Sequence, residues 1–274
     1  MKKKFTKRSL ALLLAALVLL GIGGFGTAWA ASPAIRGEYY NAWFYLNHLQ
    51  VHLLENGRDV CGGHNDLNGS AKISGQLVQY LGYESKSKLG EVEPGRKYKE
   101  EIAARNGSDI PIFLRLTMRK YWIDTATGEK VSNLSPNRIR LTYGDQAYNA
   151  GAWQINPAET STESATYYYT TTLGAGADTA PLFDTLVIDD EVAKIEEVTT
   201  RTEGNKTIYK YKYHYDGYAF FIEADVQAIQ THNVMDAIHS QWGVNNVTAS
   251  FTAKQAVGEN DKKVEVGTGT LSVG

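Results

Sequence analysis

The stretch Tyr167–Ile188 is the feature that most restricts what this chain can fold into. It begins with Tyr167–Leu173, seven residues rich in aromatic and β-branched side chains, which favour a strand. Two glycines and a proline in 174–181 then interrupt the run, and a second apolar run, Leu182–Ile188, follows. The stretch carries no nucleophile–base pattern, metal-ligand cluster or phosphate loop. It therefore predicts strand, turn and strand, with a role in building a sheet.

Alternation of apolar and polar residues predicts several more strands. The clearest case is Ile112–Trp122, where Ile112, Leu114 and Leu116 alternate with bulkier or polar neighbours. Ala150–Asn156 is expected to pair with Tyr167–Leu173. Further strands are predicted at Tyr45–Glu55, Ala71–Tyr83, Lys97–Asn106 and Arg138–Tyr143, with turns at Asn56-Gly57 and Pro94-Gly95 between them.

The segment Lys206–Gln230 predicts one long antiparallel hairpin that turns at Asp216-Gly217. Its first arm places a row of tyrosines on one strand face: Tyr209, Tyr211, Tyr213 and Tyr215. Such a row suits a subunit interface, a platform on which sugars stack, or a face covered by neighbouring strands.

A short helix is predicted at His232–Trp242, where Val234, Ala237, Ile238 and Trp242 share one helical face. Asn233 is expected to cap its start and Gly243 to end it. Many short strands and this single helix predict an all-β fold, a sandwich of two antiparallel sheets with one short helix near the C-terminus.

Residues 1–30 have the features of a secretory signal peptide. A basic start precedes the apolar run Leu10–Leu20, and Ala28-Trp29-Ala30 fits a small-residue cleavage site, so cleavage is predicted between Ala30 and Ala31. The apolar run is about half of the ~20 residues that a membrane span needs, so we expect no span in the mature protein. The sequence thus predicts a secreted protein, extracellular or on the cell surface.

The mature chain is acidic. Removing the leader takes five of 28 Lys and Arg residues, and the remaining 23 face 30 Asp and Glu, a net charge of −7. Nucleic-acid binding needs a basic face, so nucleic acid is not an expected partner. Cys61 is the sole cysteine, which excludes an internal disulfide, and we place it in a polar loop.

Candidate sites for chemistry are sparse. No H-E-x-x-H, dinucleotide-binding or phosphate-loop motif occurs, and we expect no catalytic residues and no cofactor. His48 and His52 share a predicted strand face and are weak candidates for metal ligands, against the alternative of a solvated face. Asp189-Asp190-Glu191 offers clustered carboxylates that suit calcium, but it lacks the spacing and glycine of an EF-hand, which favours a solvated acidic turn.

Several short motifs, taken in order, resemble the TasA/camelysin family of secreted biofilm-matrix and surface proteins. They are Val51-His52-Leu53-Leu54-Glu55-Asn56, Val92-Glu93-Pro94-Gly95, Leu114-Arg115-Leu116, Leu134-Ser135-Pro136, Thr179-Ala180-Pro181-Leu182-Phe183 and Glu223-Ala224-Asp225-Val226. The leader also resembles the class processed by the dedicated signal peptidase of the TasA system.

The resemblance implies a jelly-roll-like β-sandwich and a role as a Gram-positive biofilm fibre subunit or accessory protein. It implies an N-terminal segment at 31–44 that adds a strand to a neighbouring subunit, a sandwich at 45–243, and C-terminal strands with a polar tail at 244–274. The implied partners are other copies of the chain, further matrix or cell-wall components, and the signal peptidase. A camelysin-like metalloendopeptidase and an extracellular carbohydrate-binding module are the alternatives.

Overall fold

The computed structural model describes residues 49–61, 70–78, 92–145, 150–257 and 263–274. The predicted leader with its Ala30–Ala31 cleavage site, the segment 31–44 and His48 lie outside the described residues.

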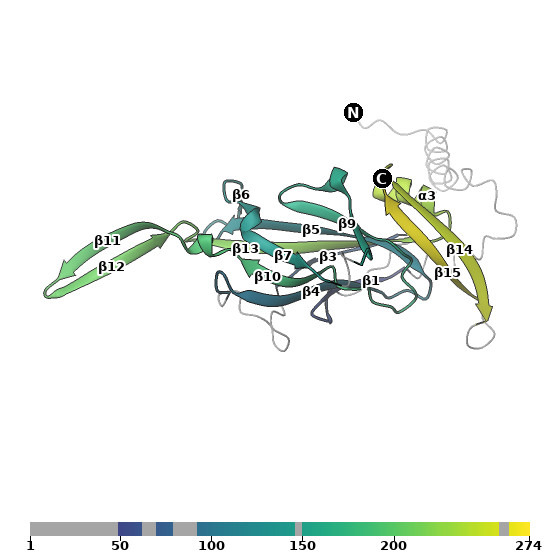
Figure 1. Cartoon of the computed structure of the whole chain (residues 1–274), viewed down its shortest axis with the longest axis horizontal. Coiled ribbons are helices and arrows are strands. Elements are labelled where there is room, and N and C mark those ends of the chain that lie inside the picture. The colour runs from purple at the N-terminus through teal and green to yellow at the C-terminus, as the bar shows by residue number, and fades with distance from the viewer. Residues whose placement is uncertain (1–48, 62–69, 79–91, 146–149, 258–262) are drawn as a thin grey trace, which may run out of the picture. The chain divides into compact units, whose positions relative to one another are not determined.

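Most strands belong to two antiparallel sheets (Figure 1). The first sheet has the order β2-β1-β4-β10-β7, with β1 at Val51–Glu55, β2 at Arg58–Cys61, β4 at Lys97–Asn106, β7 at Ile139–Tyr143 and β10 at Phe183–Ile188. The second has the order β3-β13-β5-β9-β8, with β3 at Ser70–Gln76, β5 at Ile112–Asp124, β8 at Trp153–Ile155, β9 at Ser164–Tyr169 and β13 at Tyr218–Gln230; the short β6, Lys130–Val131, pairs with β5.

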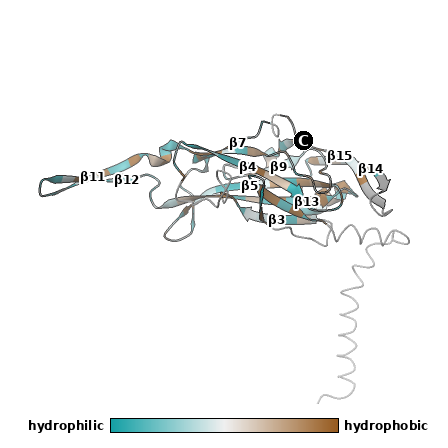
Figure 2. Cartoon of the chain, turned by 90° about the horizontal axis from the view of Figure 1, so that it is seen from below, coloured by the Kyte–Doolittle hydropathy of each residue, from teal (hydrophilic) through white to brown (hydrophobic). Residues whose placement is uncertain are grey.

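The two sheets pack against each other through apolar residues that alternate with polar residues along each strand. Figure 2 shows hydrophobic and hydrophilic residues mixed along these strands. In β5, Leu114 and Leu116 are fully buried in this core, while Arg115 and Thr117 point to the other face. Ile102 from β4 and Val226 from β13 are equally buried. The prediction of an all-β antiparallel sandwich with one short helix near the C-terminus is confirmed.

The stretch Tyr167–Ile188 forms strands that lie in different sheets. β9 pairs with β5 and β8, whereas β10 pairs with β4 and β7. The predicted pairing of Ala150–Asn156 with Tyr167–Leu173 is confirmed by β8 and β9. The intervening loop therefore crosses from one sheet to the other, and the Oγ1 of Thr179 accepts a hydrogen bond from the backbone N–H of Ala104 on the way.

The predicted hairpin over Lys206–Gln230 is wrong. The turn forms, with Gly217 at φ +86°, but the strands on its two sides do not pair with each other. β12 (Lys206–Tyr213) pairs with β11 (Ile195–Glu203), and β13 has β5 along one edge and β3 along the other. Alternation defines the two faces of a strand but not its neighbours, and both edges of β13 are already occupied.

A second apolar core lies on the outer face of the second sheet. The helix α3 (Val234–Ala237) and the π-helical turn η5 (Ile238–Trp242) pack there with Phe113, Tyr168 and the hairpin of β14 (Val247–Val257) and β15 (Lys263–Val273). The four predicted helix-face residues are all buried in this core. Gly243, at φ +67°, ends the helical segment as predicted; Asn233 has a left-handed backbone and its side chain caps nothing, contrary to the prediction.

Candidate assembly surfaces

One edge of the first sheet is open in the described part of the chain. β7 is the last strand of that sheet, and no described strand pairs with its outer edge. The carbonyl of Arg138 accepts a hydrogen bond from the N–H of Asp189. Because the backbone groups of an antiparallel strand alternate in direction, the N–H and C=O groups of Arg140 and Thr142 face β10. The backbone groups of Leu141 consequently face away from β10.

A groove of about 140 Å³ runs between the two sheets beside this edge. Its lining is mixed: Leu141, Tyr143, Tyr167 and Phe183 are apolar or aromatic, whereas Arg119, Lys120 and residues 161–164 are polar. Tyr143 and Phe183 stack at a centroid distance of 5.1 Å. The Nζ of Lys120 donates to the Ile139 carbonyl at 2.7 Å, and burial lowers the pKa of this lysine. The groove therefore offers apolar side-chain contacts next to an unpaired strand edge.

On the opposite side of the sandwich, Cys61 connects the two sheets by a hydrogen bond. This residue ends β2 rather than lying in a loop, and its Sγ donates to the Ser74 carbonyl of β3 at 2.8 Å. A side chain at Gly75 would come within 2.9 Å of Leu53, so the two edges approach closely. Burial raises the pKa of the Cys61 thiol, which disfavours the reactive thiolate.

The strands β11 and β12 form a two-stranded ribbon that pairs with no other described strand. Every residue of both strands is exposed, and Figure 1 shows the pair leading away from the sandwich strands. Tyr209 is 57% exposed, Tyr211 46% and Tyr213 41%. Of the readings given to the tyrosine row, coverage by neighbouring strands is therefore wrong for these three residues.

Cross-strand register divides the ribbon into two chemically distinct faces. We call one the tyrosine face; its members carry no charge and are Ile195, Val198, Thr200, Thr202, Thr207, Tyr209, Tyr211 and Tyr213. The opposite, charged face consists of Glu197, Thr199, Arg201, Glu203, Lys206, Ile208, Lys210 and Lys212. The ribbon is thus amphipathic although neither face is covered.

The fourth tyrosine of the row, Tyr215, lies apart from the ribbon. It is half-buried against Trp122 at a centroid distance of 4.6 Å. Together with Tyr213, Phe220 and Val192 it lines a cleft of about 550 Å³ at the base of the ribbon. Among the described residues Asp216 is the one charged residue of this lining. The cleft continues the apolar surface of the tyrosine face through Tyr213.

Of the two histidine candidates for metal ligands, His52 lies within the described residues and His48 lies outside them. The Nδ1 of His52 lies 2.5 Å from the Asp59 carboxylate, and its Nε2 side lies against Gly107. Across the described residues, no three His, Cys, Asp or Glu side chains gather closely enough to hold a metal ion. Within the same residues, no helix has both the length and the apolar character to cross a bilayer.

The acidic step at 189–191 is tied to arginines. Asp189 starts a short 3-10 helix by accepting the N–H of Glu191, and its carboxylate lies 3.4 Å from Arg138. That backbone hydrogen bond and the charges of Arg140 and Arg138 lower the pKa of Asp189. Glu191 in turn pairs with Arg138 at 2.7 Å. These contacts fit a structural turn.

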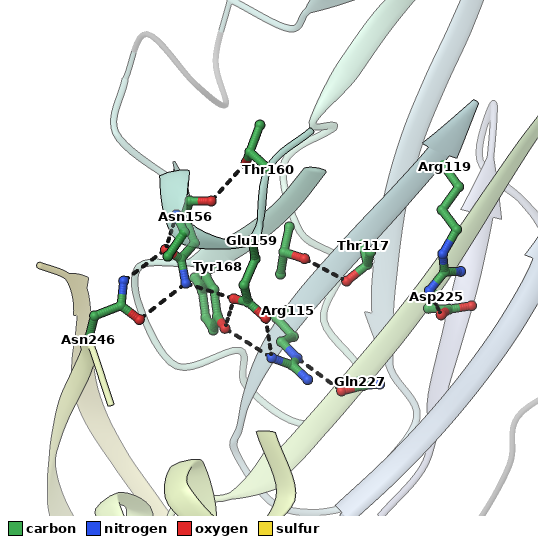
Figure 3. A network of polar contacts seen from close by, with 12 residues as sticks. Arg115, Thr117, Arg119, Asn156, Glu159, Thr160, Tyr168, Asp225, Gln227 and Asn246 are labelled. Atoms are coloured by element: carbon green, nitrogen blue, oxygen red, sulfur yellow. Dashed lines mark hydrogen bonds and ion pairs between the residues drawn. The ribbon is translucent and has the colours of Figure 1, made fainter. Parts of the chain in front are cut away.

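A polar network holds the outer face of the second sheet together (Figure 3). Arg115 donates to Gln227, Glu159 and the Tyr168 hydroxyl at 2.9 to 3.1 Å. Hydrogen bonds between Asn156 and Asn246 extend the network toward β14. Sequence reasoning missed this network because its members come from distant segments. Its groups satisfy one another, which makes it a structural connection.

One pair of carboxyl side chains lies inside the sandwich. Glu55 and Glu100, on the neighbouring strands β1 and β4, are both fully buried. Burial and the adjacent Glu55 carboxylate raise the pKa of Glu100 to about 9, so this side chain is protonated at neutral pH. The pair lies at no described cleft.

The described residues thus present an open strand edge at β7, an amphipathic ribbon, and an aromatic cleft at its base. A scan against protein-family models and a search of curated proteins each gave no match for this chain. What the chain does has to be inferred from these surfaces and from its sequence.

Proposed function

We propose that this chain is a secreted structural protein of the cell surface or extracellular matrix that self-associates by β-strand addition. The observation that carries the proposal is the outer edge of β7, which has no described partner strand and borders a groove with both aromatic and polar lining residues. The leader-like sequence at 1–30 and the resemblance to secreted matrix proteins give the location and the class. The clustered acids and histidines supply no comparable support for catalysis.

Strand addition suits this edge on physical grounds. An incoming strand gains backbone hydrogen bonds from Leu141 and contacts between its alternate side chains and the groove. The segment 31–44 of a neighbouring copy is the donor in this proposal, because it contains Tyr39, Tyr40, Trp43 and Phe44. Its aromatic side chains can pack against Tyr143, Tyr167 and Phe183 in the lining of the groove.

The test compares three forms of the mature protein by negative-stain electron microscopy and light scattering. Residues 31–274 are expected to form filaments or large oligomers, whereas deletion of 31–44 abolishes filaments. Leu141→Pro is expected to do the same, because it removes an outward-facing N–H while keeping the bonds to β10. If residues 31–274 stay monomeric under every condition tested, the proposal is rejected.

A further inference from the structure

The ribbon of β11 and β12 is incomplete as it stands in one chain. An isolated two-stranded ribbon is only marginally stable in water, and a third strand or a packed face is normally required. Here neither exists within the described residues, yet one face gathers Val198, Ile195 and three tyrosines without a single charge. An uncharged face of this composition normally packs against another protein surface.

The charged residues restrict which surface of the ribbon meets an identical ribbon. β11 carries Glu196, Glu197 and Glu203 against Arg201, whereas β12 carries Lys206, Lys210, Lys212 and no acid. Two-fold pairing along an edge would therefore set lysine rows against each other, or glutamate rows against each other. Packing through the uncharged face avoids both and leaves every charge in water.

We propose that two copies of this chain pack tyrosine face to tyrosine face, with their ribbons antiparallel and related by a two-fold axis. This inference rests on the proposed function and names one contact of the assembly. In such a pair each surface meets itself, as isologous contacts require. The antiparallel overlap brings the tip of each ribbon to the base of the other, next to the aromatic cleft lined by Tyr213 and Tyr215.

The available area fits a weak but specific contact. With roughly 200 Å² for a whole tyrosine, the half-exposed tyrosine face offers on the order of 500 Å² per copy, and a pair buries about 1,000 Å², the lower end for specific interfaces. A contact of this size needs reinforcement from others. Strand addition at β7 would supply it in a filament.

The test uses mature protein lacking 31–44, in which strand addition is removed and the ribbon contact is isolated. The matched variants are Thr200→Lys on the tyrosine face and Thr199→Lys, its neighbour on the charged face. Sedimentation is expected to show a concentration-dependent dimer for the parent and for Thr199→Lys. Thr200→Lys is expected to weaken the dimer at least tenfold, because it buries a charge in an apolar contact.

Three outcomes would overturn the inference. They are a parent that remains monomeric, equal effects of both lysines, and no effect of either. A monomeric parent that binds soluble polysaccharide, and loses that binding on Thr200→Lys, would identify the face as a carbohydrate platform instead. Filament formation by residues 31–274 is measured separately. A failure of the ribbon contact can therefore be told apart from a failure of the proposed function.

Discussion

The two ribbons of this protein, β11–β12 and β14–β15, have the same antiparallel pairing and opposite surroundings. Val247 and Leu271 of the second ribbon are buried in the core that contains Phe113 and Trp242. Its backbone also joins the sheet, since Leu271 donates to the Thr170 carbonyl at 2.7 Å. No residue of β11 or β12 is buried.

The difference shows what fixes a ribbon in place. β14–β15 contributes apolar residues at one end of its length, and the outer face of the second sheet provides a complementary patch there. β11–β12 carries its apolar residues along one whole face, and none of the described sheets covers them. The β14–β15 ribbon belongs to the fold of one chain, whereas the β11–β12 ribbon is suited to contacts between chains.

Truncating Trp242 should produce the largest difference between the regions. Its ring contacts Tyr168 at a centroid distance of 5.3 Å, and we expect Trp242→Ala to lower the free energy of unfolding by about 3–5 kcal/mol. Tyr211→Ala should cost less than about 0.5 kcal/mol, since that side chain is exposed. Urea unfolding of protein that lacks 31–44 and carries Thr200→Lys, in which strand addition is removed and the ribbon contact is weakened, measures both. Similar losses would show that the ribbons do not differ.

Glycines in the two ribbons should give a smaller contrast. A Cβ at Gly269 of β15 would lie 2.5 Å from the Ser250 carbonyl oxygen and 2.6 Å from Phe113, so Gly269→Ala should destabilise the fold by about 1–3 kcal/mol. Gly204, at the tip of β11–β12, has nothing within 4 Å but a φ of +60°. Gly204→Ala should cost about 1 kcal/mol, confined to the ribbon. Hydrogen exchange would locate each effect; loss of protection in the sheets on Gly204→Ala would contradict it.

The last contrast lies inside the sandwich and depends on pH, because it involves the buried carboxyl of Glu100. Because the pKa of Glu100 is raised to about 9, the folded state holds its proton while the unfolded state releases it above pH 4.5. Stability from this group is therefore complete below pH 4.5 and is lost as pH rises toward 9. Glu100→Gln does not titrate, so its advantage should grow across that range by up to about 1.4 kcal/mol per pH unit.

The control for this change is Glu101→Gln. Glu101 is half-buried and pairs with Lys99 at 2.8 Å, so its replacement should give no gain that grows with pH. Thermal unfolding of both variants between pH 4.5 and 9 decides the matter. An advantage of Glu100→Gln that is independent of pH would contradict the assignment of a buried, protonated carboxyl.

Sequence patterns located β4 and β5 well because local alternation records which side of a strand meets the core, but they predicted no strand at β11 and placed Cys61 of β2 in a loop. Lys97–Asn106 matches β4 at both ends, and the buried face of His232–Trp242 follows the predicted residues. The same reasoning failed at Lys206–Gln230. The turn and both strands form there as predicted, but the two strands pair with other strands and not with each other. The polar network around Arg115 was equally hidden, since Glu159, Tyr168 and Gln227 are far apart along the chain.

What the sequence by itself determined is the all-β class, the two faces of each strand and the short helix near the C-terminus, because each follows from residues close together in the chain. Only the tertiary structure decided that β12 joins β11 rather than β13 and that the tyrosines of β12 stay in water. It also decided that β14–β15 closes a second core. Strand neighbours are decided when segments that are far apart in the sequence compete for the same strand edge. The outcome of that competition leaves no pattern among residues that are close together in the chain.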